Sequence, residues 1–492
     1  MEERLRVLFV TAEVTPFART GGLGDMTAAL SQVLSALGHD VRLVIPLYQT
    51  VRDGGFALTE VATDLSVPLV TGRRTARVWQ GSFAGREGPA DVPVYFIEQD
   101  DYFARPGLYG DETGDYADNA QRFVFFCRAA LALAERLEWF PQVFHCHDWH
   151  TALVPAFLRF LPGLAARVSA AAALFTIHNL AYQGWFPAWA FGITGLPLSL
   201  FRVGGVEFFG LMNFMKAGLY YADQLSTVSP TYAQEICTPE LGFGLDGVLR
   251  DRREVLTGIL NGVDYQGWNP ATDPALAAHY SAADLTGKAV CKRALLRTYE
   301  MPEDLAAPLV GLISRFVDQK GVDLVADAID RLLTLGLRLV VLGSGEARYE
   351  RRFAELGRRY PARVGVRLGF NDALAHQIQA GSDCLLMPSR YEPCGLTQLY
   401  SLRYGTIPTV RATGGLRDTV VPFDPASGQG TGFVFLEPRA EALVEAVGTA
   451  RRVFADRQAW LRLMHNAMAQ DFSWGQSATR YLDLYRRAIA TR

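Results

Sequence analysis

Short apolar runs alternate with helical patterns along almost the whole chain, and this alternation restricts the fold more than any other feature. The run Arg6–Val10 is followed by a glycine-rich loop, by apolar residues at helical spacing from Met26 to Leu37, and by a second run, Val41–Ile45. A strand, a helix and a strand in this order form a βαβ unit, in which the two strands lie parallel in one sheet. We therefore expect an α/β fold.

The same alternation starts again in the second half of the chain. Leu309–Ile313 is an apolar run, Val322–Leu335 has helical periodicity, and Leu337–Leu342 is the next apolar run. At 492 residues the chain is longer than a single core usually supports. Asn261-Gly262 is a strong turn signal between the two series. The sequence therefore predicts two doubly wound domains that meet near this turn, followed by an amphipathic C-terminal helix.

Composition excludes several classes of protein. The net charge of −3 argues against a nucleic-acid-binding surface, which is normally basic. No run of 18 apolar residues is present, and the first apolar run is too short for a signal peptide. The six cysteines are scattered without a C-x-x-C pair, as in reduced intracellular proteins. We expect a cytoplasmic protein that binds neither nucleic acid nor membrane.

The segment Ser389–Thr397 follows the apolar run Asp383–Met387 and combines one acid, one proline and one glycine. In open α/β sheets ligands bind at the carboxyl ends of strands, so Glu392 is expected to point into a cleft. Behind it, the backbone N–H groups of Cys394–Thr397 are expected to open a helix, where anions bind. A carboxylate beside an anion site predicts a ligand in which a sugar is joined to a phosphate.

A glycine loop, Arg19–Asp25, joins the first strand to the first helix. Its glycines would let the backbone approach a ligand closely, and the helix start would favour negative charge. The spacing is neither that of a dinucleotide fingerprint nor that of a P-loop. A plain structural turn is the alternative.

Three histidines and a cysteine lie within residues 145–150, which raises the question of a metal site. In a strand, His145 and His147 would share one face, whereas Cys146 and Asp148 would face the other way. This geometry is poor for a closed zinc site. We favour a strand-end loop that offers Asp148 to a polar ligand, with a hydrogen-bonded structural cluster as the alternative. His178 ends a further strand and could serve either role.

Two cations, Arg315 and Lys320, lie within six residues after the run Leu309–Ile313. At a strand end such a pair can clamp a diphosphate through charge-assisted hydrogen bonds. An exposed surface pair is the alternative.

Taken together, these segments resemble the bacterial glycogen synthases and plant starch synthases over nearly the whole chain. The resemblance is carried by Thr20–Asp25, His147–His150, His178–Gly184, Ser226–Tyr232, Asn261–Asp264, Ser314–Arg315, Gln319–Gly321, Glu392–Gln398 and Thr413–Leu416. It implies a GT-B fold of two facing Rossmann-like domains, residues 1–262 and 263–472, with the active site in the cleft between them. Residues 473–492 would form a helix that packs back on the first domain.

The resemblance also implies an activity. Such an enzyme transfers glucose from ADP-glucose, with retention, to the non-reducing end of an α-1,4-glucan such as glycogen or a malto-oligosaccharide, without a metal or other cofactor. Arg315, Lys320 and the N–H groups near Leu396 and Thr397 would bind the diphosphate. Around the glucose we expect Glu392, Asn261, His178, Asp148, Cys394 and Gly395. Phe370 would stack on adenine. Gly22 and Arg19 would complete the donor site, and Arg19 stands at a position where the family usually has lysine.

No residue stands out as a nucleophile beneath the sugar, so we expect front-face substitution through an oxocarbenium-like state. A related transferase with another acceptor, such as a sucrose-type synthase, is the main alternative. A glycan-binding or phosphorolytic protein is a second alternative, but no pyridoxal-phosphate motif is evident. The preference for ADP-glucose over UDP-glucose follows from the resemblance alone.

Overall fold

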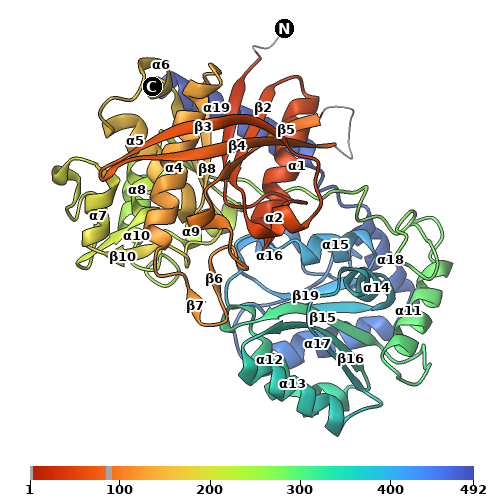
Figure 1. Cartoon of the computed structure of the whole chain (residues 1–492). Helices are drawn as coiled ribbons and strands as arrows, with labels where there is room; N and C mark the ends of the chain where they lie inside the picture. The colour runs from red at the N-terminus through yellow and green to blue at the C-terminus, as the bar shows by residue number, and fades with distance from the viewer. Residues whose placement is uncertain (1–3, 85–90) are drawn as a thin grey trace. The chain divides into compact units, whose positions relative to one another are not determined.

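The computed structural model describes residues 4–84 and 91–492. The chain divides into two compact units, each built around its own sheet (Figure 1). The first unit contains Met1–Val228, Ala233–Gly262 and Trp474–Arg492, and the second contains Ser229–Tyr232 and Val263–Ser473. Residues 229–232 lie with the second unit, where the backbone N–H and hydroxyl of Thr231 bond to the Asp418 carboxylate at 2.9 and 2.6 Å.

The first unit contains a nine-stranded sheet in which β1 lies between β2 and β8. The seven strands from β14 to β5, with β1 among them, are parallel to one another, as strands joined by crossover connections are. Two long antiparallel strands, β3 and β4, extend one edge. The strand order is β14 (Leu256–Gly258), β13 (Gln224–Thr227), β9 (Ala172–Ile177), β8 (Val143–His147), β1 (Arg6–Val10), β2 (Asp40–Pro46), β5 (Asp91–Glu98), β4 (Gly72–Ala84) and β3 (Thr59–Leu69).

The second unit contains a six-stranded, all-parallel sheet. Its order is β17 (Val364–Leu368), β16 (Arg338–Gly345), β15 (Leu309–Phe316), β18 (Cys384–Met387), β19 (Ile407–Arg411) and β20 (Phe433–Phe435). This is the doubly wound order, and the direction of winding reverses between β15 and β18. The corresponding reversal in the first sheet lies between β1 and β8. Each reversal point is where a doubly wound sheet binds ligands at its carboxyl edge.

One predicted strand end differs from the structure. The sequence predicts that the strand ends at Ile313, but β15 continues to Phe316 because Ser314, Arg315 and Phe316 pair with Gly343, Ser344 and Gly345 of β16. Arg315 is therefore held by the sheet rather than by a loop.

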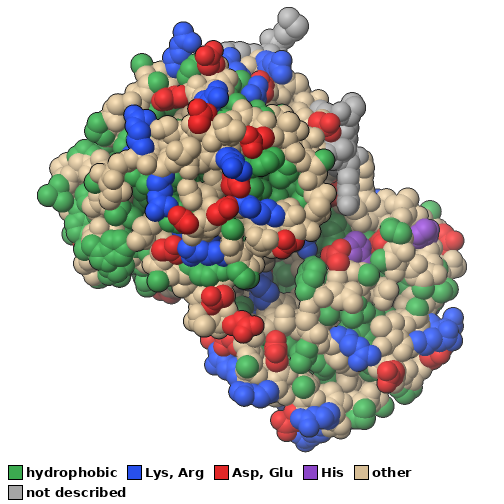
Figure 2. Space-filling view, in the orientation of Figure 1, with side chains coloured by type: hydrophobic (Ala, Val, Ile, Leu, Met, Phe, Trp, Pro, Cys, Tyr) green, Lys and Arg blue, Asp and Glu red, His purple; other side chains and the backbone are tan. Residues whose placement is uncertain are grey.

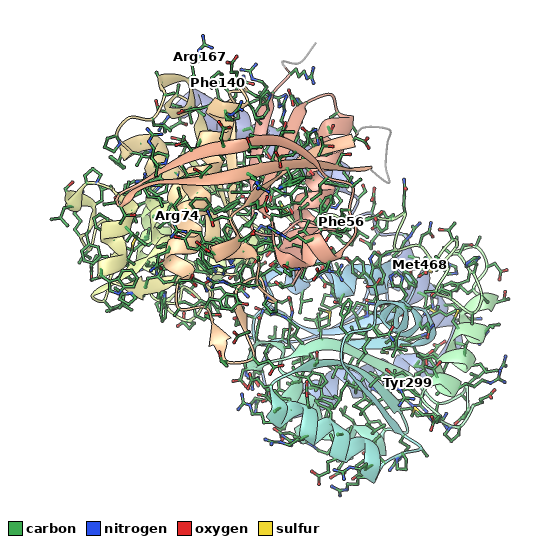
Figure 3. All side chains as sticks on the ribbon, viewed as in Figure 1. Phe56, Arg74, Phe140, Arg167, Tyr299 and Met468 are labelled. Carbon is green, nitrogen blue, oxygen red and sulfur yellow. The ribbon has the colours of Figure 1, made fainter. Side chains whose placement is uncertain are left out.

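Helices cover both faces of the second sheet (Figure 1). One face packs against α12 (Val322–Thr334), α13 (Ala347–Arg359) and α17 (Ala440–Ala455), and the other against α11 (Thr286–Thr298) and α14 (Asp372–Gly381). Tyr299, labelled in Figure 3, lies beneath the second face, where its hydroxyl donates to the carbonyl of Val341 at 3.1 Å. Burying this ring removes a large apolar area from water while its polar tip stays hydrogen-bonded.

In the first unit, α1 (Gly22–Ala36), α4 (Asn119–Arg136), α5 (Leu153–Phe160) and α8 (Phe214–Tyr221) surround the sheet. The last helix, α19 (Trp474–Thr491), packs against α1 and β9. Its buried Tyr485 hydroxyl lies 2.9 Å from Nδ1 of His145, and its Ser477 hydroxyl donates to the carbonyl of Leu260 at 2.6 Å. The apolar face of this C-terminal helix thus has its partner within the first unit.

Shorter elements complete the fold. A small sheet is formed by β10 (Trp185–Pro187), β12 (Leu211–Asn213) and β11 (Glu207–Phe208), and a two-stranded one by β6 (Gly110–Asp111) and β7 (Gly114–Asp115). The remaining α-helices are α2 (Gln49–Asp53), α3 (Asp100–Phe103), α6 (Ala166–Ser169), α7 (Trp189–Thr194), α9 (Pro230–Glu235), α10 (Asp246–Asp251), α15 (Thr397–Arg403), α16 (Gly414–Thr419) and α18 (Arg457–Met468). Within residues 4–84 and 91–492, every helix is too short or too polar to cross a bilayer.

Candidate functional site

Asp148 lies immediately after β8, at the reversal point of the first sheet. Its Oδ1 accepts the backbone N–H of His178 at 2.7 Å and lies 3.5 Å from the N–H of Asn179, so it joins the ends of β8 and β9. Its backbone has φ 54° and ψ −176°, a conformation that side-chain-bearing residues rarely adopt. Such strain costs about 1–3 kcal/mol and concentrates at functional sites.

Burial also changes the protonation of Asp148. The side chain is buried, and loss of solvation raises its pKa to about 7, although the two backbone N–H groups oppose this shift. Near neutral pH the group therefore exchanges a proton readily. It can hold a sugar hydroxyl either as an acceptor or as a donor.

His178 and the neighbouring histidines form a hydrogen-bonded cluster. Nδ1 of His147 lies 3.1 Å from Nε2 of His178, and Nε2 of His145 lies 2.6 Å from the Thr176 hydroxyl. Burial lowers the pKa of all three imidazoles, that of His178 to about 3, so they are neutral at physiological pH. His178 can thus exchange hydrogen bonds with a ligand but contributes no positive charge.

The geometry gives no support to the metal site that residues 145–150 raise as an alternative. As the sequence predicts, His145 and His147 lie on one face, with ring centroids 4.1 Å apart, but both ring nitrogens of His145 and Nδ1 of His147 bond to protein groups. Across residues 4–84 and 91–492 there is no group of three or more His, Cys, Asp or Glu side chains arranged to hold a metal ion.

The glycine loop is held by a residue that the sequence did not single out, Glu13. Its carboxylate accepts the backbone N–H and the hydroxyl of Thr20, both at 2.6 Å, and lies 3.3 Å from the N–H of Gly21. It also accepts the Tyr109 hydroxyl at 2.6 Å. The negative charge expected at this loop is therefore supplied in part by the protein itself. A single acid three residues after the end of the first strand was the available sequence signal.

Other predicted residues of the first unit lie around this loop. Gly22 begins α1, and Nη1 of Arg19 lies 3.2 Å from Oδ1 of Asp25, at the start of the same helix. Tyr109 stacks on His150 at 4.3 Å between ring centroids, which links the loop to the segment carrying Asp148.

Asn261 lies beyond β14. Its side chain is buried, and its amide oxygen has no hydrogen-bond partner among the residues that the structure describes. An unpaired buried acceptor costs about 1–3 kcal/mol. A ligand hydroxyl could satisfy this oxygen.

Arg315 lies near the end of β15, at the reversal point of the second sheet. Its side chain is exposed, and within the described part of the chain its guanidinium has no hydrogen-bond or ion-pair partner. A guanidinium presents a planar set of donors that matches phosphate oxygens. This cation is therefore available for an anion.

Lys320 and Glu392 form an ion pair across the same reversal point. The Lys320 ammonium lies 2.8 and 2.6 Å from the two oxygens of Glu392, and the Ser389 hydroxyl donates to Glu392 at 2.9 Å. The sequence predicts a carboxylate aimed into a cleft. In the structure Glu392 is buried, and its carboxylate balances the charge of Lys320 and links the ends of β15 and β18.

The loop after Glu392 is shaped by close backbone approach. A Cβ atom on Gly415 would lie 1.9 Å from the Cys394 carbonyl, and Gly395 has φ 72°. The sequence predicts that Cys394–Thr397 open a helix. In the structure α15 begins only at Thr397, and Cys394, Gly395 and Leu396 form the turn before it, because the left-handed Gly395 cannot continue a helix.

Phe370 follows β17 and is separated from it by Gly369, whose φ is 113°. Phe370 is 78% exposed, which is unusual for a large aromatic residue. An exposed ring of this kind can stack on a planar ligand.

The structure thus brings Asp148 and His178 together in the first unit, and Lys320 and Glu392 together in the second. These two groups, with Arg315, lie at the carboxyl ends of strands on the two reversal points. The group in the first unit can hold sugar hydroxyls through neutral and acidic side chains, and the group in the second unit can hold an anion through its basic side chains.

Comparisons with known proteins agree with this chemistry. Residues 6–251 match the starch synthase catalytic domain, and residues 301–454 match the glycosyl transferases group 1 domain. A glycogen synthase from Syntrophotalea carbinolica is 47% identical over 99% of both chains, and one from Anaeromyxobacter dehalogenans is 49% identical over 98% of this chain and 99% of its own length.

Solved structures give the same result. The catalytic domain of starch synthase IV from Arabidopsis thaliana, solved with ADP and acarbose, superposes with a TM-score of 0.90 at 36% identity, covering 99% of this chain and all of that one. Sucrose-phosphate synthase from Thermosynechococcus elongatus shares the fold, with a TM-score of 0.60 at 18% identity and 99% and 100% coverage.

Proposed function

Because the chain belongs to the glycogen and starch synthase family of glycosyltransferases, with its GT-B fold of two Rossmann-like domains, we propose that it transfers glucose from ADP-glucose to the non-reducing end of an α-1,4-glucan, with retention. The observation that carries the proposal is the Arg315 guanidinium, which has no partner among the described residues and lies on β15, the strand that leads to Lys320 of the Lys320–Glu392 pair. ADP is the nucleotide named for the starch synthase IV structure, which supports this choice of donor.

The second domain supplies the charge for the leaving group. As the glycosidic bond to the diphosphate breaks, negative charge grows on the departing oxygens. Arg315 and Lys320 are cations that can stabilise this charge, with the N–H groups of Leu396 and Thr397 as further donors. Preorganised charge of this kind often contributes about 3 kcal/mol per group.

Glu392 has two tasks in this scheme. It fixes the position of the Lys320 ammonium through two short hydrogen bonds. Its negative charge also favours an oxocarbenium-like sugar. Cys394 and Gly395 offer backbone groups to the sugar hydroxyls, and the exposed Phe370 ring is the proposed stacking surface for adenine.

The first domain supplies hydrogen bonds to the sugar. Asp148 and the neutral His178 can orient glucose hydroxyls, and the Asn261 oxygen, which no described residue bonds, offers a third contact. Gly22 and Arg19 in the glycine loop are proposed to contact the donor. A retaining enzyme with a carboxylate nucleophile would hold two carboxyl groups about 5 Å apart. We instead propose front-face substitution, in which the departing diphosphate takes the acceptor's proton.

We further propose that the reaction needs no metal ion, because the two cations can balance the diphosphate charge. The test measures transfer of labelled glucose from ADP-glucose or UDP-glucose to glycogen, maltotriose and fructose, with and without EDTA. We expect an α-1,4-linked product from ADP-glucose and the glucans, unaffected by EDTA. Transfer to fructose alone, or glucan phosphorolysis without any nucleotide, would contradict the proposed function.

A further inference from the structure

The small sheet of the first unit carries a row of three aromatic rings, Trp185, Phe208 and Phe209, of which the two outer rings are exposed. The ring centroids of Trp185 and Phe208 are 5.8 Å apart, and those of Phe208 and Phe209 are 4.7 Å apart. Phe209 is 85% exposed and Trp185 is 53% exposed, whereas Phe208 is buried between them. Figure 2 shows hydrophobic side chains gathered over this region, around α7 and β10.

The backbone at Phe209 is strained. Phe209 and Gly210 form the two-residue loop between β11 and β12, and their φ values are 50° and 82°. Positive φ at both loop positions is the pattern of a type I′ turn, which favours Asn-Gly or Asp-Gly. A bulky side chain at the first position is an outlier. Phe209 thus combines a strained backbone conformation with a large apolar side chain that is exposed to water.

The row is rigidly supported. The indole N–H of Trp185 donates to the Gln183 amide oxygen at 2.8 Å, and the Gln183 amide donates to the carbonyl of Phe243 at 3.1 Å. A Cβ atom on Gly244 would lie 2.8 Å from the Phe208 ring, so that loop packs directly against the row. Rings held in this way lose little freedom when a ligand stacks on them.

Two charged side chains next to the row, Lys216 and Glu207, are hydrogen-bonded to backbone groups of the protein. The Lys216 ammonium donates to the carbonyls of Val203 and Glu207, and the Glu207 carboxylate accepts the N–H of Gly210. The exposed part of the row therefore presents uncharged ring faces and edges. This suits an uncharged ligand with flat apolar patches, such as the C–H faces of glucose units, better than an ionic one.

The row also continues from the candidate site. The segment that contains His178 leads through Gln183 and Gly184 to Trp185, and a Cβ atom on Gly184 would lie 2.5 Å from the Trp149 ring. Trp149 directly follows Asp148. The aromatic row is therefore connected, through the chain segment 178–185 and through the packing of Gly184 on Trp149, to the strand ends that carry Asp148 and His178.

We propose that the row Trp185–Phe208–Phe209 is a binding surface for α-glucan, on which glucose units beyond those near the reacting end stack. This inference rests on the proposed function. It adds a contact for polymeric acceptors that is separate from the groups assigned to the transfer step.

The test compares the wild type, Phe209→Asn and Val203→Asn as full chains in native gels that contain increasing glycogen. Phe209→Asn places the residue preferred in a type I′ turn at the strained position, so its thermal midpoint should equal or exceed that of the wild type. Its apparent Kd for glycogen should nevertheless rise about fivefold. Val203 is also exposed, at 77%. The control variant Val203→Asn removes apolar area without removing a ring, and it should bind glycogen as the wild type does.

Three results would overturn the proposal. Glycogen could retard Phe209→Asn in the gel as strongly as the wild type, or Val203→Asn could lose as much affinity for glycogen as Phe209→Asn does. A molecular mass of Phe209→Asn half that of the wild type in light scattering would identify the row as an interface between copies. The proposed function is judged separately. Wild-type transfer of glucose to maltotriose supports it whatever the gels show, and its absence refutes it even if the row binds glycogen.

Discussion

The ammonium of Lys320 lies within 2.8 Å of both carboxylate oxygens of Glu392, so the cation proposed for the diphosphate and the acid proposed for the sugar hold each other in place. The pair joins the loops after β15 and β18. Beside it, the Gln319 amide donates to the Tyr391 carbonyl at 3.2 Å, and the Arg390 N–H donates to the Gln319 carbonyl at 2.8 Å. Position and charge in this site are therefore coupled.

Lys320→Ala should reduce turnover by at least about 100-fold, because a transition-state cation is lost. It should also destabilise the second domain by about 3 kcal/mol, because a buried carboxylate loses its counter-ion. Adding Glu392→Gln removes the unpaired charge, so the double variant should regain stability but not activity. Urea unfolding and initial rates measure the two effects. A fully active Lys320→Ala, or a double variant as unstable as the single one, would contradict the coupling.

Arg315 should behave differently, because its guanidinium has no partner among the described residues. Arg315→Ala should leave the thermal midpoint unchanged and weaken ADP binding by about 10- to 100-fold, as expected for the loss of a charge-assisted hydrogen bond. Arg351→Ala, which removes an exposed cation on α13, is the matched control and should bind ADP normally. Calorimetric titration with ADP compares them. Equal affinities in the two variants would remove Arg315 from the donor site.

Much of the second domain could be predicted from the sequence because its strands are short and apolar, and because the helices between them have apolar residues at helical spacing. The position of Glu392 after a strand was also predictable, since Asp383–Met387 and the following turn are unambiguous. Its ion pair with Lys320 was not, because the two residues are 72 positions apart and meet only through the strand order β15–β18. Strand order is a property of the whole chain, and local patterns do not contain it.

Less of the structure of the first domain could be predicted from the sequence. Glu13 lies in an otherwise apolar stretch, and nothing local shows that its carboxylate turns back to the glycine loop. Tyr109, which bonds to it, is 96 residues away. The long antiparallel strands β3 and β4 also went unpredicted, because Thr59–Leu69 mixes acids and apolar residues with register shifts that break the alternation.

Asp148→Asn should separate stability from activity. The folded-state pKa of Asp148, about 7, exceeds the ordinary value of 3.8. The protonated form is therefore favoured by folding, and the wild type loses stability as pH rises from about 4 to 7. Asparagine does not titrate, so the stability of the variant relative to the wild type should increase over this range by about 3–4 kcal/mol and then stay constant. Turnover should fall at every pH. Urea unfolding at pH 4.5, 6 and 8 tests this, and a difference independent of pH would show that Asp148 is ionised in the folded protein.

Glu13 should act by positioning the glycine loop. In Glu13→Gln, one of the two accepting oxygens becomes an NH2 donor and the negative charge is lost, so the four donors that converge on the carboxylate keep only one accepting oxygen. We expect kcat/KM for ADP-glucose to fall by about 10- to 100-fold, the usual cost of a misplaced site. Tyr109→Phe removes one of the four donors and should cost less. Glu60→Gln, on the exposed edge of β3, is the control and should behave as the wild type. Steady-state kinetics would reveal a positioning role as a loss in Glu13→Gln that exceeds the loss in Tyr109→Phe. If Glu13→Gln kept full kcat/KM, the loop would be fixed by other contacts, and Glu13 would have no part in binding the donor.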